Sequence, residues 1–255
     1  MQLDADPKET FTMKKIAILT SGGDSPGMNA AIRAVARSAI AKGMEAVGVM
    51  RGFEGLLDGD FRPLGARDVG GIIHRGGTIL QTARSTRFME HQWQEKAAGN
   101  LLDAGIQGLA VIGGGGSFQG ARELQKRGVA VAGIPGTIDN DIAGTELAIG
   151  FRTAVETALD AVMRLRDTAS SHDRLFIVEV MGGRSGFLAL DVAVAGGAEA
   201  VIVPEVQFSL GRLIDRLHEA RKKGKTHSLI ILAEGVMPPR SYATGSRTPP
   251  ATTPG

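Results

Sequence analysis

The chain has 255 residues, of which 43% are hydrophobic and 22% are charged, a composition typical of a soluble globular protein with one large or two modest domains. A net charge of +2 and an aromatic content of 4% argue against nucleic-acid binding, and the absence of cysteine excludes disulfides, thiolate catalysis and cysteine metal sites. No apolar run approaches the roughly 18 residues that span a bilayer, and no signal peptide is recognisable, so we expect a cytoplasmic protein without membrane contact.

Strand-like and helix-like segments alternate along the chain. We expect strands at Lys15–Thr20, Ala46–Met50, Leu109–Ile112, Val129–Ile134, Leu175–Val180, Ala200–Val203 and Leu229–Ala233. We expect helices at Ala30–Lys42, Glu95–Ala104, Gly120–Lys126, Arg152–Arg166, Phe187–Ala195 and Leu210–Lys222. Strands that lack polar alternation and are separated by helices favour parallel sheets covered on both faces. The predicted fold class is therefore α/β, with two Rossmann-like domains.

The two ends of the chain differ in composition from its middle. Residues 1–13 are polar and irregular, and we expect an N-terminal extension without a fold. Residues 14–150 and 151–237 are expected to form the two α/β domains. Residues 238–255 are dominated by Pro, Thr, Ser, Gly and Arg, and we expect a disordered tail there.

Glycine-rich loops follow several predicted strands, at the edge where parallel α/β sheets bind ligands. Ser21–Asn29 follows the first strand, and Gly113–Ser117 lies between a strand and a helix. Backbone N–H groups in such loops approach anions closely, so both are candidate phosphate cradles, although the first is also compatible with a tight strand-to-helix turn. Arg75–Thr78 and Thr82–Arg84, which we place after a middle strand, offer arginines for phosphate oxygens; solvated surface arginines are the alternative.

The loop Pro135–Asp141, with the sequence PGTIDND, is the most specific signal in the chain. Its two carboxylates, Asp139 and Asp141, can divide the chemistry: one can take a proton from a hydroxyl and the other can hold a metal. The alternative is a solvated acidic turn, because Asn and Asp favour turns.

Two further loops carry polar groups at the same kind of sheet edge. Val178–Gly186 follows a strand and opens a helix, and Glu234 ends the last predicted strand, where it could accept sugar hydroxyls or pair with a basic residue. His172 is expected to be structural. Neither a Walker A lysine motif nor a pair of histidines at metal spacing is present, which excludes a P-loop kinase and a histidine metal site.

Five motifs occur in one order: TSGGDSPGMNAAIRAVAR, RGGTILQTAR, PGTIDND, SSHDR and VEVMG. With this set the chain resembles the bacterial-type ATP-dependent 6-phosphofructokinases, from about Lys14 to Gly235. The resemblance implies the phosphofructokinase fold and transfer of the γ-phosphate of ATP to the 1-hydroxyl of fructose 6-phosphate, a step of glycolysis. It also implies Mg2+, a homotetramer, ADP or phosphoenolpyruvate as effector, an ATP-binding domain over 14–150 and a sugar-phosphate domain over 151–237.

The resemblance assigns roles by position. The ATP phosphates would be lined by Gly23, Arg84, Ser85, Gly114, Gly115, Gly116 and Ser117. The sugar phosphate would be bound by Thr137, Asp139, Arg174, Met181, Gly182, Gly183 and Glu234, and the catalytic set would be Asp139 as general base with Thr137 and Arg84. Arg174 would reach the substrate of a neighbouring subunit, and Asp141 would support magnesium. The effector would be bound by Arg33, Arg37, Arg166, Glu199, Lys223 and Lys225.

Three departures from the family pattern bear on activity. The family's glycine loop reads GGDGS, whereas Gly115 stands here in place of the aspartate that supports magnesium. An arginine usually follows VEVMG directly, whereas this chain has Gly183 there and Arg184 one place later. The family's chain continues well past Glu234, so we expect a C-terminally truncated chain.

These departures leave two functions open: an ATP-dependent 6-phosphofructokinase, of full or impaired activity, and a relative that binds nucleotide or sugar phosphate without turnover. A pyrophosphate-dependent phosphofructokinase is a third alternative. That branch of the family carries a second acidic residue in the glycine loop and a lysine at the start of the TIDND loop. This chain has Gly116 and Gly136 at those places, and both leave room for a nucleotide.

Overall fold

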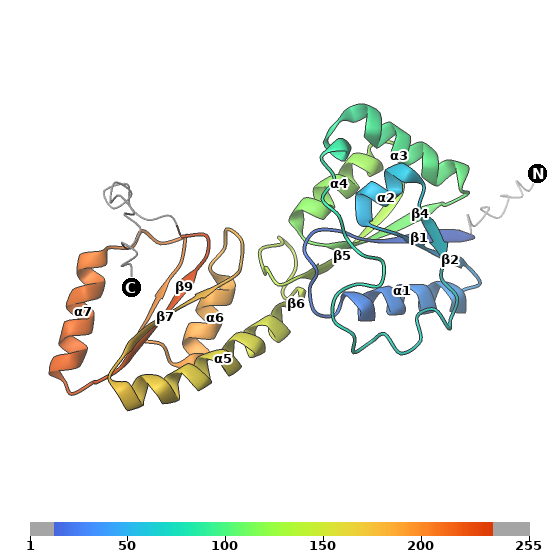
Figure 1. The fold of residues 1–255 in the computed structure, drawn as a ribbon. Coiled ribbons are helices and arrows are strands. Elements are labelled where there is room, and N and C mark those ends of the chain that lie inside the picture. The colour runs from blue at the N-terminus through green and yellow to red at the C-terminus, as the bar shows by residue number, and fades with distance from the viewer. Residues whose placement is uncertain (1–12, 237–255) are drawn as a thin grey trace, which may run out of the picture. The chain divides into compact units, whose positions relative to one another are not determined.

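The structure is a computed structural model of the whole chain, and it describes residues 13–236. The chain divides into two compact units, Met1–Thr157 and Ala158–Gly255, and both are drawn as ribbons in Figure 1. The expected N-terminal extension, apart from Met13, and the expected tail at 238–255 lie outside the described residues. No helix within residues 13–236 is long and apolar enough to cross a membrane.

The first unit is built around a six-stranded sheet. Its elements are β1 (Lys15–Thr20), α1 (Met28–Ala41), β2 (Glu45–Val49), α2 (Gly52–Asp58), β3 (Phe61–Pro63), the 3-10 helix η1 (Arg87–Met89), α3 (His91–Asp103), β4 (Gly108–Gly113), α4 (Gly115–Gln125), β5 (Ala130–Thr137) and β6 (Ile149–Gly150). The strand order is β3-β2-β1-β4-β5-β6, and only β3 runs antiparallel to its neighbour. The strand order reverses between β1 and β4, and such a switch point is where open α/β sheets bind ligands.

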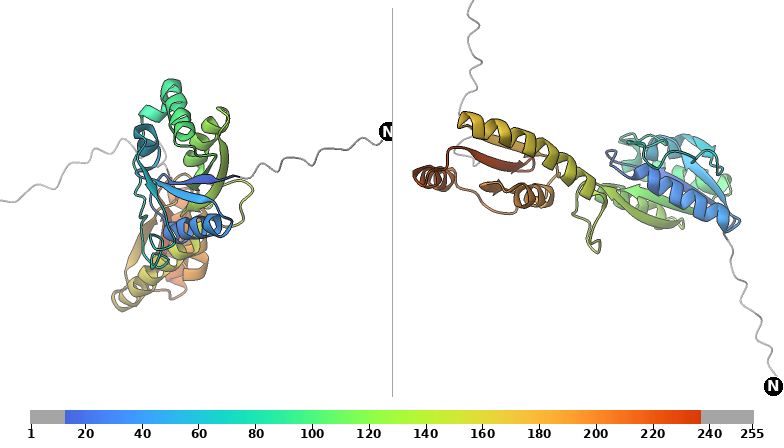
Figure 2. Two further views of the ribbon diagram at one scale, coloured as in Figure 1. Left: turned by 90° about the vertical axis from the view of Figure 1, so that its right-hand side faces the viewer. Right: turned by 90° about the horizontal axis from the view of Figure 1, so that it is seen from below.

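Alternate residues of β1 face two separate cores. Ala17 and Leu19 pack with side chains of α2, α3 and α4, whereas Ile18 packs with side chains of α1. Helix α1 covers one face of the sheet, and α2, α3 and α4 cover the other, as Figures 1 and 2 show. All three β1 residues are fully buried, which explains why this parallel strand reads as a continuous apolar run.

The second unit contains most of the long helix α5 (Phe151–His172), which begins in the first unit, followed by β7 (Leu175–Val180), α6 (Phe187–Gly196), β8 (Ala200–Ile202), α7 (Leu210–Lys222) and β9 (Ser228–Ala233). Its three strands are parallel and lie in the order β7-β9-β8. Helix α6 ends against α5, where a Cβ on Gly196 would lie 3.1 Å from Val162 Cγ1. Val180 and Ala233 are paired at the carboxyl ends of β7 and β9, so these two strand ends lie side by side.

The predicted fold class is confirmed, and each of the strands and helices expected from the sequence is present. Two details of the prediction were wrong. Helix α4 begins at Gly115 and not at Gly120, because the glycines expected to form a loop already make its first turn. Arg75 follows no strand; residues 64–79 form irregular backbone against α1.

Four short elements were not expected from the sequence: α2, β3, η1 and β6. Each is brief, and β3 and β6 span three and two residues. Periodicity is visible only over longer segments, so elements of this length leave no readable pattern.

Candidate functional site

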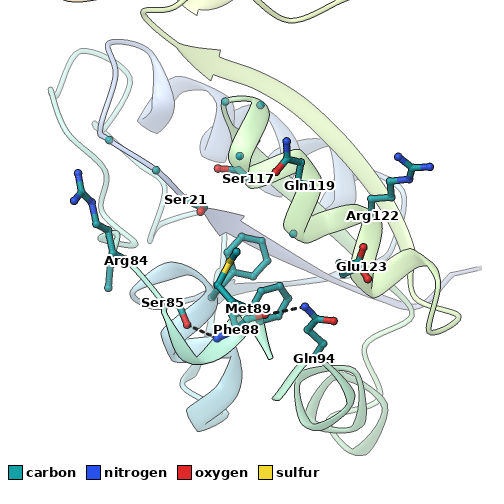
Figure 3. A pocket seen from close by; sticks show the side chains of 18 of the residues that line it. Ser21, Arg84, Ser85, Phe88, Met89, Gln94, Ser117, Gln119, Arg122 and Glu123 are labelled. Carbon is teal, nitrogen blue, oxygen red and sulfur yellow. Dashed lines mark hydrogen bonds between the residues drawn. The ribbon is translucent and has the colours of Figure 1, made fainter. Parts of the chain in front are cut away.

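The carboxyl ends of β1, β4 and β5 open onto a cavity of about 980 Å³ in the first unit. Two glycine loops line it: Ser21 to Gly23 after β1, and Gly114 to Gly116 at the start of α4. Figure 3 shows Ser117 and Gln119 of α4 on the side of the pocket near Ser21, with Arg84 on the other side. The N-cap residue of α4, Gly114, makes no side-chain capping hydrogen bond, so the helix presents backbone N–H groups to the cavity.

The two glycine loops lie against each other, and this contact requires small residues. A Cβ on Gly113 would lie 2.5 Å from Ser117 Oγ and 2.6 Å from the carbonyl oxygen of Ser21, closer than real side chains come. Gly22 has a φ of 90°, in the left-handed region that favours glycine. The sequence therefore places glycine where the backbone of one loop meets the backbone of the other, and the result is a concave rim of N–H groups.

Arg84 is held at the rim by hydrogen bonds that fix the segment before it. Thr20 Oγ1, at the end of β1, donates to the carbonyl oxygen of Gln81 at 3.0 Å and lies 3.0 Å from Thr78 Oγ1. Asn29 Nδ2, in the first turn of α1, donates to the carbonyl oxygens of Arg75 and Gly76. Motif residues of the first strand and helix thus position the arginine segment; Arg75 itself does not line the cavity, whereas Arg84 does.

The far wall of the cavity is apolar and aromatic. Phe53 of α2 stacks on Phe88 of η1, with ring centroids 4.3 Å apart and an angle of 29° between the rings. A Cβ on Gly120 would lie 2.7 Å from Phe53 Cζ, so α4 packs directly on this pair. Gln94 Nε2 donates to the carbonyl oxygen of Phe88 at 2.9 Å (Figure 3). The cavity therefore combines glycine loops rich in N–H groups with an aromatic pair, and polar side chains such as His91, Gln94 and Glu123 line it as well.

Ion pairs connect η1, which carries Phe88, to α2, which carries Phe53. The guanidinium of Arg87 donates to Glu54 through Nε at 3.0 Å and through Nη2, and to Asp58 through Nη2 at 3.1 Å. These hydrogen bonds hold the pKa of Glu54 below its ordinary value of 4.5 and the pKa of Asp58 below 3.8. Because the cavity-lining residues Ser85 and Phe88 lie within two residues of Arg87, the ion pairs fix the backbone of this wall.

The proposed catalytic loop follows β5, the strand next to β4. Thr137 ends β5, and its Oγ1 accepts a hydrogen bond from the backbone N–H of Asp139 at 3.1 Å. Both Thr137 and Asp139 line the cavity. Asn140 Nδ2 donates to the carbonyl oxygen of Glu146 at 3.1 Å, which closes the loop on itself. Asp141 is exposed. The structure thus brings the predicted Thr137 and Asp139 to the same cavity as the glycine loops.

A metal site built from the protein alone is not found in the described part of the chain. Within residues 13–236 no group of three or more His, Asp or Glu side chains is arranged to hold a metal ion. Magnesium in proteins typically binds one or two carboxylates and completes its shell with water and substrate phosphates. The predicted magnesium residue Asp141 is exposed and is not among the residues that line the cavity.

In the second unit, Glu234 supports the loop after β7. Its Oε1 accepts hydrogen bonds from the backbone N–H groups of Gly182 at 3.2 Å and Gly183 at 2.7 Å. Met181, just before them, is 61% exposed. Of the predicted sugar-binding residues in this unit, Met181, Gly182, Gly183 and Glu234 are therefore brought together at one sheet edge.

Arg174 lies apart from that group. It immediately precedes β7, whereas Met181 follows β7, so the two residues lie at opposite ends of a six-residue strand. A strand of that length spans roughly 20 Å. Arg174 and the loop after β7 therefore do not form one site within this chain.

The predicted effector residues fall on both units. Arg166 donates to the carbonyl oxygens of Gly196 and Gly197 at the C-terminal end of α6, and Lys225 pairs with Glu199 just before β8. Burial alone would raise the pKa of Glu199, but the N–H of Leu229 and the ammonium of Lys225 outweigh it and lower that pKa. Lys223 caps α7, while Arg33 and Arg37 lie one turn apart on α1 of the first unit.

Sequence reasoning missed the aromatic wall and its anchor. Phe53, Phe88 and Gln94 line the cavity, and Arg87 holds that wall through Glu54. The sequence offers no signal for Phe53, Phe88 and Arg87, because they come from short elements without periodicity. Gln94 lies near the start of α3, one residue before the predicted helix. The predicted Gly23, Arg84, Ser85, Gly114, Gly115, Gly116 and Ser117 all line the same cavity.

The switch-point loops and the cavity define a doubly wound α/β protein with a ligand site at the sheet edge. The sequence matches the family model described as phosphofructokinase over residues 15–248. The chain is also 54% identical over 226 residues to the ATP-dependent 6-phosphofructokinase of Natranaerobius thermophilus, with 89% of this chain and 71% of the relative covered. The chain belongs to the phosphofructokinase family.

Solved structures support the same assignment. Phosphofructokinase from Saccharomyces cerevisiae superimposes with a TM-score of 0.81 at 39% identity, over 88% of this chain and 34% of the yeast chain. A pyrophosphate-dependent phosphofructokinase from Nitrosospira multiformis superimposes with a TM-score of 0.76 at 20% identity, over 89% of this chain and 62% of that one. The second likeness shows the fold alone.

Proposed function

We propose that the chain is an ATP-dependent 6-phosphofructokinase, which transfers the γ-phosphate of magnesium-bound ATP to the 1-hydroxyl of fructose 6-phosphate. The observation that carries this proposal is the cavity of the first unit. Its glycine rim suits a triphosphate, and the stacked Phe53 and Phe88 suit a base. Pyrophosphate would use only the rim, so the apolar wall favours a nucleotide as donor.

Each side of the proposed reaction has its own residues. The N–H groups at the start of α4 and the guanidinium of Arg84 bind the phosphates of ATP. Asp139 takes the proton of the sugar hydroxyl, and Thr137 orients the loop that carries Asp139 through the hydrogen bond to its N–H. Asp141 would hold magnesium, which would supply charge neutralisation at the transferred phosphate. Met181, Gly182, Gly183 and Glu234 bind fructose 6-phosphate.

Regulation and assembly follow from the same family assignment. A homotetramer in the cytoplasm, with Arg174 reaching a neighbouring subunit's substrate, agrees with the position of Arg174 away from the loop after β7. ADP or phosphoenolpyruvate is the proposed effector. Its proposed ligands in the second unit are Arg166, Glu199, Lys223 and Lys225, and Arg33 and Arg37 are the predicted effector residues of the first unit.

A second candidate function is binding without turnover, and Gly115 favours it. This position carries no carboxylate for magnesium, although a side chain would fit there. A coupled assay of ADP formation with fructose 6-phosphate and magnesium separates the two functions. ADP formation that depends on the sugar supports the kinase, whereas nucleotide binding with no such ADP formation supports the second function.

The role of Asp139 gives a sharper prediction. General-base catalysis is worth roughly 10²–10⁴-fold, so Asp139→Ser should lower kcat by about that factor while ATP binding changes little. Asp103→Ser, at an exposed carboxylate that ends α3, is the matched control and should leave kcat unchanged. A kcat for Asp139→Ser within threefold of the parent would contradict the assignment.

A further inference from the structure

The turn Gly182–Gly186, which joins β7 to α6, is held at both ends by carboxylates from other parts of the second unit. At its start, Glu234 Oε1 accepts from the N–H groups of Gly182 and Gly183. At its end, Glu205 Oε1 accepts from the N–H of Gly186 at 2.7 Å. Gly186 is the N-cap residue of α6, so Glu205 lies at the positive end of that helix.

Hydrogen bonds inside the turn connect its two ends. The backbone N–H and the hydroxyl of Ser185 both donate to the carbonyl oxygen of Gly182, each at 3.1 Å. Ser185 is buried, and Gly182 and Gly183 adopt φ values of 139° and 61°. A shift of Gly186 would therefore pull on Ser185 and, through it, on Gly182.

The turn is closely packed by the segments that follow β8 and β9. A Cβ on Gly186 would lie 2.5 Å from Val203 Cβ and 2.7 Å from Glu205 Oε2. A Cβ on Gly235 would lie 2.5 Å from the carbonyl oxygen of Gly183. The segments after β8 and β9 thus press against the turn from both sides while their carboxylates hold its N–H groups.

We propose that Glu205 is a positioning residue for the proposed sugar-phosphate loop of the second unit. It holds Gly186, and through Ser185 and Gly182 it fixes the backbone of Gly182 and Gly183 and the exposed Met181 side chain just before them. Glu205 itself touches no substrate. This inference rests on the proposed function, in which Met181, Gly182 and Gly183 contact fructose 6-phosphate.

The first test measures fructose 6-phosphate affinity of the 255-residue chain by calorimetry. Glu205→Ala should weaken binding of fructose 6-phosphate at least tenfold and leave ADP affinity within threefold, because the nucleotide residues lie in the first unit. Glu205→Gln keeps an acceptor oxygen for Gly186 and should stay within threefold of the parent for both ligands. Glu219→Ala, which removes an exposed carboxylate of α7, is the control for lost charge.

The second test does not depend on substrate. Amide hydrogen exchange followed by NMR should speed up at least tenfold at Gly182, Gly183 and Gly186 in Glu205→Ala, and not in Glu219→Ala. If the parent binds no fructose 6-phosphate, the proposed function fails, and exchange alone decides the positioning role. Should Glu205→Ala not fold, Glu205→Asp replaces it, because its shorter side chain withdraws the carboxylate from Gly186.

Two results would overturn the inference. One is unchanged exchange at Gly182 and Gly183 when Gly186 has lost its partner. The other is fructose 6-phosphate affinity within threefold of the parent in a variant whose turn exchanges faster. Loosening the turn would then have no consequence for substrate binding.

Discussion

At the scale of single residues, Gly115 bears on the two proposed functions of the cavity, phosphate transfer and binding without turnover. Gly115 is the first residue of α4, and an ideal Cβ built there meets no heavy atom within 4 Å. Its φ lies outside the left-handed region, so a side chain is tolerated there without backbone strain. The absence of a carboxylate at this position is therefore a chemical difference and not a steric requirement.

We predict that Gly115→Asp raises turnover at least tenfold, which corresponds to about 1.4 kcal/mol of barrier. In the proposed reaction, an aspartate there would add a second carboxylate for magnesium, which would supply charge neutralisation at the transferred phosphate. Nucleotide affinity should change by less than threefold, because the N–H groups at the start of α4 do not depend on this side chain.

Gly116→Asp is the matched control for that measurement. Gly116 is also open, with no heavy atom within 4 Å of an ideal Cβ, so the variant adds the same charge one residue further along α4. It should not raise turnover. Equal turnover with Gly and Asp at position 115 would mean that Asp141 alone suffices for magnesium.

At the scale of elements, the short helix α2 and the 3-10 helix η1 build the aromatic wall of the cavity. We propose that this wall makes the cavity a site for a nucleotide and not for phosphate alone. Neither α2 nor η1 has a periodic sequence pattern of its own, and ion pairs join them. Arg87 also lies over the Trp93 ring of α3, with 5.3 Å from its guanidinium carbon to the ring centroid. One side chain thus links three elements around the cavity.

We predict that Arg87→Met lowers the melting temperature at pH 7 and that the difference from the parent shrinks in acid. The pKa values of Glu54 and Asp58 lie below their ordinary values of 4.5 and 3.8 because of Arg87. Such depressed values contribute stability above the ordinary pKa and lose it as the pH falls through the folded-state pKa. Melting curves from pH 7 down to about pH 3 test this.

Arg62→Met provides the comparison. Arg62 Nη2 lies 3.9 Å from Asp68 between two exposed side chains, an ion pair of the kind that contributes little to stability. Its melting temperature should follow that of the parent at every pH. A constant difference between Arg87→Met and the parent across the range would show that packing, and not charge, carries the effect of Arg87.

At the scale of the whole molecule, the second unit leaves apolar surface on an edge strand. Within the described residues β7 pairs only with β9, and its side chains at Leu175 and Ile177 are 47% and 58% exposed. Exposed edges that carry apolar side chains promote association of chains.

We predict that the chain associates in a concentration-dependent way and that Ile177→Lys weakens this association. A lysine on the edge strand opposes pairing with another chain. Ile73→Lys is the matched control, because Ile73 is also 58% exposed but lies in irregular backbone of the first unit. Sedimentation velocity at several concentrations measures both variants, and equal weakening by the two would rule out the β7 edge as the contact.

The sequence predicted those features of the protein that a short segment specifies by itself. The strands Lys15–Thr20 and Leu175–Val180 and the helix Leu210–Lys222 agree with the structure to the residue, because a buried parallel strand or an amphipathic helix carries its pattern within itself. Glycines after β1 and β4 also marked the loops of the cavity, since glycine adopts a left-handed φ most readily and permits the close approach of two backbones.

Only the tertiary structure decided which residues surround those loops. The wall of Phe53 and Phe88 and the ion pair of Arg87 with Glu54, 33 residues away, arise where distant segments meet. Glu205 and Gly186 are likewise 19 residues apart and meet only because β8 and β7 belong to one sheet. Local patterns record how a segment buries its own side chains, whereas such contacts depend on how the strands are ordered, which no single segment encodes.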